Sequence, residues 1–236
     1  PFLNRKKSFY SLLLTGLFNN LAIWADKFIF WMRPETSEQI IGPLRASLIY
    51  DLPIFLAYLS IIPGMGVFLM RMETDFAEKY DQFYDAVRGG ESLDRIYTLK
   101  EGMIFALRQG IYQIFKVQGM TALVLILAGP RLLDAIGISR LYLPLFNVDL
   151  VGVGMQMVLL GVLNAVFYFD YRRSALLINL AFLIGNIVFT SITIRMDYAF
   201  YGYGYAMATT TTTFIGLLIL LRRLDQLEYE TFMLQK

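Results

Sequence analysis

One apolar run that is long enough to cross a lipid bilayer ends abruptly in a charged segment, and this limits what the chain can fold into. The run YDLPIFLAYLSIIPGMGVFLM, from Tyr50 to Met70, is followed directly by RMETDFAEKYDQFYDAVRGG. A helix that rises about 1.5 Å per residue needs about 20 apolar residues to cross roughly 30 Å of hydrocarbon. The run therefore predicts a membrane span that ends close to Arg71.

Two prolines, Pro53 and Pro63, lie inside this predicted span. Each removes a backbone donor that lipid cannot replace, so neighbouring helices, hydroxyl groups or water must satisfy the freed carbonyl groups. We therefore expect a kinked span that faces other helices or a cavity.

The composition extends the membrane assignment to the whole chain. Of the 236 residues, 57% are hydrophobic and 17% are charged, whereas about 25% are charged in an ordinary soluble domain. The expected fold class is all-α: a polytopic membrane protein of about six transmembrane helices plus a cytoplasmic amphipathic helical elbow. The predicted spans are residues 9–32, 47–70, 111–129, 145–169, 175–194 and 200–221.

The basic residues between the predicted spans indicate the orientation. With the N-terminus in the cytoplasm, most Lys and Arg residues lie on the cytoplasmic side, and an even number of spans keeps both termini there. The chain opens with PFLNRKK, without an initiator Met or a signal-peptide pattern. These features favour a fragment or a processed form of a longer protein.

The elbow, residues 72–110, carries two predicted helices. The apolar face of the first consists of Phe76, Tyr80, Phe83, Tyr84 and Val87. We expect this helix to end at Gly89 and Gly90, and a second helix from Ser92 to lie in the membrane interface and lead into the third span. The elbow either anchors the cytoplasmic surface or uses Tyr80, Phe83 and Tyr84 to dock a cytosolic partner.

Two aromatic clusters, WADKFIFW and YAFYGYGY, lie at predicted outer edges of the membrane. An aromatic belt at headgroup depth explains both clusters. The alternative is stacking on the apolar faces of sugar rings. The candidates for such stacking are Trp24, Trp31, Tyr201 and Tyr203.

Polar residues inside the predicted spans indicate an interior of protein or water, because such residues are costly in lipid. The candidates for a transport path are Asn19, Asp26, Asp51, Asp149, Gln156, Asn164, Asn179 and Asn186. Their amide and carboxylate groups suit the hydroxyl and N-acetyl groups of carbohydrate. Hydrogen bonds between helices explain the same residues without a ligand.

Asp26 has a charged neighbour in the sequence, Lys27. Adjacent residues on a helix point about 100° apart, so Lys27 is expected to be a poor partner for Asp26. Arg45, which precedes the second span, is the better candidate.

Sequence patterns of catalysis are absent. The chain has no His and no Cys, which removes the commonest general base, thiol chemistry and disulfides. Metal-binding DxD and the motifs GxSxG, GxxxxGK[ST] and HExxH do not occur. We therefore expect no enzymatic activity, no cofactor, no metal site and no nucleic-acid partner.

The string YDLPIFLAYLSIIPGMGVFLMRMETDFAEKYDQFYDAVRGGESLDRI resembles the second half of the PelG family, inner-membrane proteins of the bacterial Pel exopolysaccharide export system. The resemblance extends from IWADKFIFW to LLRRLDQLEYE. It implies a flippase-like exporter that moves a growing N-acetylgalactosamine-rich polysaccharide across the inner membrane for the biofilm matrix. Besides membrane lipids, it implies a cytosolic glycosyltransferase and other Pel membrane subunits as partners.

On this resemblance, residues 1–236 form a single membrane domain that is half of a larger transporter. Two alternatives remain open. One is a structural scaffold subunit of the polysaccharide synthase complex, and the other is a cation-coupled small-molecule antiporter. A continuous water-lined groove favours either transporter over the scaffold, and aromatic residues along it favour a polymer over a small solute.

Overall fold

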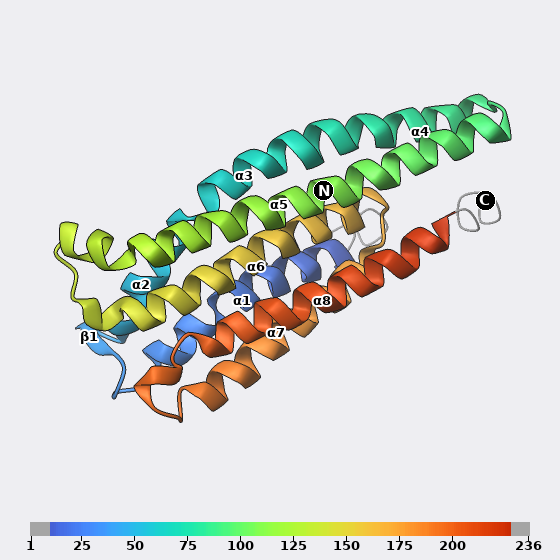
Figure 1. Ribbon diagram of the computed structural model, residues 1–236. Coiled ribbons are helices and arrows are strands. Elements are labelled where there is room, and N and C mark those ends of the chain that lie inside the picture. The colour runs from blue at the N-terminus through green and yellow to red at the C-terminus, as the bar shows by residue number, and fades with distance from the viewer. Residues whose placement is uncertain (1–9, 228–236) are drawn as a thin grey trace.

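The computed structural model describes residues 10–227, which form an elongated bundle of helices (Figure 1). The elements are α1 (Tyr10–Trp31), β1 (Glu38–Ile41), β2 (Leu44–Ala46), α2 (Leu48–Leu59), α3 (Ile61–Met70), the π-helical η1 (Arg71–Phe76), α4 (Ala77–Gly89), α5 (Leu93–Ala135), the 3-10 turn η2 (Arg140–Tyr142), α6 (Leu143–Tyr168), α7 (Arg172–Thr193), the 3-10 turn η3 (Tyr198–Phe200) and α8 (Tyr203–Asp225). The strands pair as a small antiparallel hairpin with Glu38 opposite Ala46. The predicted all-α membrane fold is confirmed.

Within the described residues, five helical stretches are long and apolar enough to cross a membrane. They are Leu48–Gly89, Leu93–Ala135, Arg140–Tyr168, Arg172–Thr193 and Tyr198–Asp225. The first predicted span corresponds to α1, which is not among the five because Asn19, Asn20, Asp26 and Lys27 lower its hydropathy. It nevertheless packs along α7. The bundle thus contains five apolar stretches and one helix of more polar sequence.

Helix α6 lies at the centre of the bundle. It contacts α5, α8 and α2, while α8 packs on α7 and α7 packs on α1 (Figure 1). Its side chains are buried on several sides, as for Leu150, Val153 and Val162. An apolar sequence around the whole circumference is what a central helix requires.

The second predicted span is broken, as its prolines suggest. Helix α2 ends at Leu59, and α3 begins at Ile61, two residues before Pro63. At the break, the side chain of Gln118 on α5 donates a hydrogen bond from Nε2 to the Ser60 carbonyl oxygen, at 3.0 Å. A neighbouring helix therefore satisfies a backbone group at the break.

The third span differs from the prediction, because no separate interfacial helix precedes it. Helix α5 is continuous over 43 residues, Leu93–Ala135. It forms a long antiparallel hairpin with α3, η1 and α4, and α4 reaches past the loop between α6 and α7 (Figure 1). Packing along this partner keeps α5 in one direction. As predicted, α4 ends at Gly89, and Gly90 adopts a left-handed conformation with φ of 67°.

Candidate functional site

A buried group of polar side chains lies where α1, α2, α6, α7 and α8 meet, toward the end of the bundle that carries the β-hairpin. We call it the polar centre. Its members are Asp26, Lys27, Tyr50, Tyr58, Asp149, Gln156, Asn186 and Tyr205. Lipid cannot solvate such groups, so each must find a hydrogen-bond or charge partner inside the protein. The pairs that they form show which groups are left to bind a ligand or a proton.

The carboxylate of Asp26 is fully buried and lies at the heart of this group. Its Oδ2 accepts hydrogen bonds from the Tyr50 hydroxyl at 2.6 Å and from Lys27 Nζ at 3.2 Å. Its Oδ1 accepts a hydrogen bond from Asn186 Nδ2 at 3.2 Å. Three helices thereby contribute donors to one carboxylate.

The ion pair of Asp26 with Lys27 contradicts the expectation that Lys27 is a poor partner. The Lys27 side chain is long and flexible, so its Nζ bends back toward Asp26 and also donates to the Ile23 carbonyl oxygen at 2.9 Å. Arg45 is not the partner. Its guanidinium donates to Ser37 Oγ and to the Ser37 carbonyl oxygen, each at 2.8 Å, and so closes the β-hairpin region.

Aromatic rings surround the Lys27 ammonium. Its Nζ lies 5.2 Å from the centre of the Tyr58 ring, 5.5 Å from that of Tyr205 and 5.9 Å from that of Trp24. Each ring is within the distance at which a cation–π attraction operates. Trp24, although 46% exposed, therefore contributes to holding the charge as well as to the bundle surface.

Gln156 connects the polar centre to a pocket. Its Oε1 accepts hydrogen bonds from the hydroxyls of Tyr58, at 3.0 Å, and Tyr205. The pocket has a volume of about 220 Å³ and is lined by residues of α1, α3, α6 and α7. Asn19 and Gln156 are its polar lining residues, and the others are apolar.

Asp149 differs from Asp26 in its surroundings. It is fully buried, and neither of its carboxyl oxygens has a hydrogen-bond partner within residues 10–227. The start of α8 covers it closely: a Cβ atom built on Gly202 would lie 2.9 Å from Asp149 Oδ1.

Three transport-path candidates lie outside both the polar centre and the adjoining pocket. Asp51 accepts hydrogen bonds from Trp31 Nε1 at 2.8 Å and from the Ser47 backbone N–H at 3.0 Å, which stabilises the first turn of α2. Asn164 donates from Nδ2 to Glu73 Oε1 at 2.7 Å, and Asn179 donates to the Ala175 carbonyl oxygen at 2.9 Å. Of the predicted set, Asn19, Asp26, Asp149, Gln156 and Asn186 come together around the pocket and the polar centre.

The remaining aromatic candidates lie near the η3 turn. Tyr201 packs edge-on against Phe30, with ring centres 5.1 Å apart. Tyr203 is exposed and lines a separate surface pocket of about 440 Å³ between α6 and α8. Stacking of these rings on sugars stays a prediction.

The apolar face of α4 packs inward, which limits its use for docking. Phe83 is 2% exposed and belongs to the core of the bundle. The Tyr80 hydroxyl donates to the Tyr168 carbonyl oxygen at 2.7 Å, and the Tyr80 and Tyr84 rings pack together with centres 4.5 Å apart. Phe83 therefore has to be removed from the predicted docking face, because the chain itself covers it, while docking through the partly exposed Tyr80 and Tyr84 stays a prediction.

Sequence analysis missed Lys27, Tyr50, Tyr58 and Tyr205 as members of the site. Tyr50 and Tyr58 are eight residues apart, which is a spacing that brings two residues to nearby positions on a helix. This spacing could have indicated Tyr50 and Tyr58 as a pair. Tyr205 gives no such signal, because it lies in an aromatic cluster that an aromatic belt at headgroup depth explains equally well.

Comparison with known proteins gives one clear match. Residues 1–232 match the family model described as "PelG: Putative exopolysaccharide Exporter (EPS-E)". The same comparisons find no matching curated protein and no matching solved structure. The family description is one of transport across a membrane, which agrees with the apolar helices, and it is not the description of an enzyme. Because the match spans nearly the entire sequence, the chain belongs to the PelG family of exopolysaccharide exporters.

Proposed function

We propose that this chain forms one wall of the path along which an exopolysaccharide crosses the bacterial inner membrane. The observation that carries the proposal is the pocket lined by Asn19 and Gln156, which lies between α1, α3, α6 and α7 and adjoins the polar centre. The other wall would come from a second membrane domain, so that residues 1–236 act as half of a flippase-like transporter.

The chemistry of the pocket supports a neutral, hydroxyl-rich substrate. Two tyrosine hydroxyls occupy Gln156 Oε1, which leaves the Nε2 group as the donor for a ligand. Asn19 offers a second amide on the opposite helix. Amides both donate and accept hydrogen bonds, as sugar hydroxyl and N-acetyl groups do, and apolar lining residues suit the carbon faces of the rings.

The test uses two adjacent asparagines on α1. Asn19 lines the pocket, whereas Asn20 is exposed and donates to the Gly16 carbonyl oxygen of its own helix. In the complete gene, restored to a strain that lacks it, Asn19→Leu should reduce secreted polysaccharide at least fivefold, and Asn20→Leu should leave it near wild type. Immunoblots of membranes must show equal protein in both strains.

Normal secretion by the Asn19→Leu strain at normal abundance would reject the path and favour the scaffold role. Equal losses in both variants would indicate a general effect on α1.

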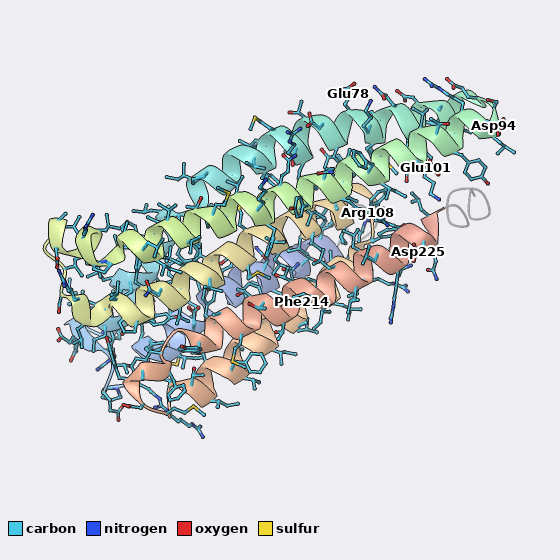
Figure 2. The ribbon with its side chains drawn as sticks, viewed as in Figure 1. Glu78, Asp94, Glu101, Arg108, Phe214 and Asp225 are labelled. Carbon is cyan, nitrogen blue, oxygen red and sulfur yellow. The ribbon has the colours of Figure 1, made fainter. Side chains whose placement is uncertain are left out.

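We further propose that the end of the molecule carrying α4 faces the cytoplasm, where a glycosyltransferase and other Pel membrane subunits would bind. The support is the gathering of charge there: Figure 2 shows Glu78, Asp94 and Glu101 on α4 and the start of α5, whereas the exposed Phe214 lies partway along α8. The same segments carry the basic residues Lys79, Arg88, Arg95 and Lys100, and an excess of Lys and Arg is typical of cytoplasmic loops. Charged side chains of this kind belong outside the hydrocarbon region.

Cysteine labelling tests this orientation, because the chain has no Cys of its own. Gln39→Cys, in the exposed β-hairpin, should react with a membrane-impermeant maleimide in intact spheroplasts. Ser92→Cys, at the exposed turn between α4 and α5, should react only after permeabilisation. The opposite pattern would reverse the topology.

A further inference from the structure

The polar centre contains two buried carboxyl groups and one cation. Asp26 and Asp149 are both fully buried, and Lys27 is the cation that interacts with both. If both carboxyls were ionised, the cluster would hold an uncompensated negative charge inside an apolar bundle, which is very costly. One carboxyl therefore has to be neutral in this packed arrangement.

The hydrogen bonds indicate which carboxyl is neutral. Asp26 accepts from Tyr50, Lys27 and Asn186, and three donors of this kind stabilise an ionised carboxylate. Asp149 accepts from no group in the described part of the chain. Asp149 is thus the carboxyl that lacks the hydrogen-bond donors that an ionised group needs.

Close packing also closes off Asp149. The Gly202 Cα lies so near that an added Cβ would stand 2.9 Å from Asp149 Oδ1 and 2.5 Å from Leu145 Cδ1. One turn further along α8, the Tyr205 ring lies against Gly152 of α6, where an added Cβ would be 2.7 Å from the ring. The first turn of α8 therefore acts as a cover over Asp149.

The charged and titratable groups around Asp149 come from three helices. Among the described residues these are Asp26 and Lys27 on α1, Tyr50 on α2 and Tyr205 on α8. Tyr50 and Lys27 donate to Asp26, and Tyr205 donates to Gln156, so each of these donors already has an acceptor other than Asp149.

We propose that Asp149 is a proton-binding site, which holds a proton while the first turn of α8 covers it and releases the proton when that turn moves away from α6. In the release step the carboxylic O–H bond breaks, its electron pair stays on the carboxylate, and a water molecule accepts the proton. Once Asp149 is ionised, two carboxylates share the single Lys27 cation. Because an uncompensated charge is costly when buried, the uncovered arrangement is then favoured.

This proposal deepens the proposed function and rests on it in one respect. If the bundle lines a sugar path, movement of α8 against α6 changes the shape of the path, and proton release at Asp149 couples to that change. Proton binding itself does not depend on transport and can be measured separately.

Infrared spectroscopy of the purified full-length protein tests proton binding directly. Near neutral pH, exposed Asp and Glu side chains are ionised, because their ordinary pKa values are about 3.9 and 4.3. The wild-type protein should nevertheless show the carbonyl-stretch band of a protonated carboxylic acid, with the shift on transfer to D₂O that such a group gives. Asp149→Asn should lose this band, whereas Asp51→Asn, which alters a carboxylate bonded by Trp31, should keep it.

Absence of the band from the wild-type protein, or its survival in Asp149→Asn, would overturn the proposal. Should Asp149→Asn fail to fold, Asp149→Glu provides the second test: the band should remain but change in frequency, and an unchanged frequency would assign it to another residue.

Export measurements separate this proposal from the path. Asp149→Asn should reduce secretion at normal abundance. If the band is present but Asn19→Leu secretes normally, the proton site stands and the path fails. If Asn19→Leu blocks export and the band is absent, the path stands and the proton site fails.

Discussion

The polar centre and a second polar group, at the junction of η1 with α5 and α6, use the same kinds of side chain in different environments. We call the second group the junction cluster; it consists of Arg71, Glu73, Asp75, Gln113 and Asn164. In the polar centre, the Lys27 and Asp26 side chains are 9% and 0% exposed, whereas those of Arg71 and Asp75 are 43% and 47% exposed. Both places hold a carboxylate, a cation and amides.

The difference in exposure determines what each ion pair does. Removing one partner of a buried pair leaves an uncompensated charge and typically costs about 3–5 kcal/mol, whereas an exposed pair contributes at most about 1 kcal/mol. The polar centre is therefore expected to contribute strongly to the packing of the helices. The junction cluster is expected to contribute little to the stability of the helical hairpin.

The largest effect is expected from removing the buried cation. Lys27→Met should lower the free energy of unfolding by about 3–5 kcal/mol, because Asp26 then keeps Tyr50 and Asn186 as donors but has no counter-charge. The measurement is chemical unfolding of the purified protein in detergent micelles. Recovery of most of this loss in the double variant Asp26→Asn, Lys27→Met would locate the cost in the unpaired charge. A double variant as unstable as the single would show that Lys27 acts through packing instead.

Sequence alone predicted several members of this buried group, but it did not predict which hydrogen bonds and ion pairs they form. Asp26, Asp149, Gln156 and Asn186 stood out because polar residues are costly inside apolar spans. Their partners did not, since Lys27 reaches Asp26 only through the flexibility of its side chain. The distance between Asp149 and the start of α8 depends on how two helices pack, which no local pattern encodes.

The helical hairpin of α4 and α5 shows the same limit: its local features were predicted, but its packing was not. The apolar face of α4 and its end at Gly89 follow from periodicity and glycine chemistry, and both were predicted. Whether that face meets a partner protein or the chain itself depends on where α5 runs. Because α5 is one long helix beside α4, the face is covered internally.

Phe83 tests how firmly the hairpin is held, away from both polar groups. Phe83→Ala should destabilise the protein by about 3 kcal/mol, since it removes a buried ring from the core. Limited proteolysis should then cut faster near Gly90, where α4 turns into α5. The matched control is Tyr97→Ala, at a 45% exposed position on α5. Unchanged proteolysis in Phe83→Ala would show that packing of this ring does not hold α4 against α5.

The next smaller effect compares a glycine beside the polar centre, Gly204, with one on the long α5 helix, Gly102. At Gly204, an added Cβ would lie 2.5 Å from Thr190 Cα, and the backbone of α7 cannot move aside easily. Gly204→Ala should therefore cost about 1–3 kcal/mol and lower the melting temperature in detergent. Gly102→Ala on α5 meets nothing within 4 Å and should leave the melting temperature unchanged or slightly raised. Equal melting temperatures for the two variants would disprove the close approach of α7 and α8.

The smallest effect is expected in the junction cluster, and it sharpens the comparison most directly. Arg71 Nη1 donates to Asp75 Oδ2 at 2.5 Å, and Arg71 Nε donates to Gln113 Oε1 at 2.6 Å. Asp75→Asn removes the negative charge but keeps an oxygen acceptor, and Gln113 continues to hold Arg71. Because the pair is one turn apart and half-exposed, the loss should be at most about 0.5 kcal/mol and should shrink further in high salt. Unfolding measured in low and high salt checks both statements. A loss near that of Lys27→Met would show that lipid or another protein buries this cluster, so that exposure in the isolated chain does not set its energy.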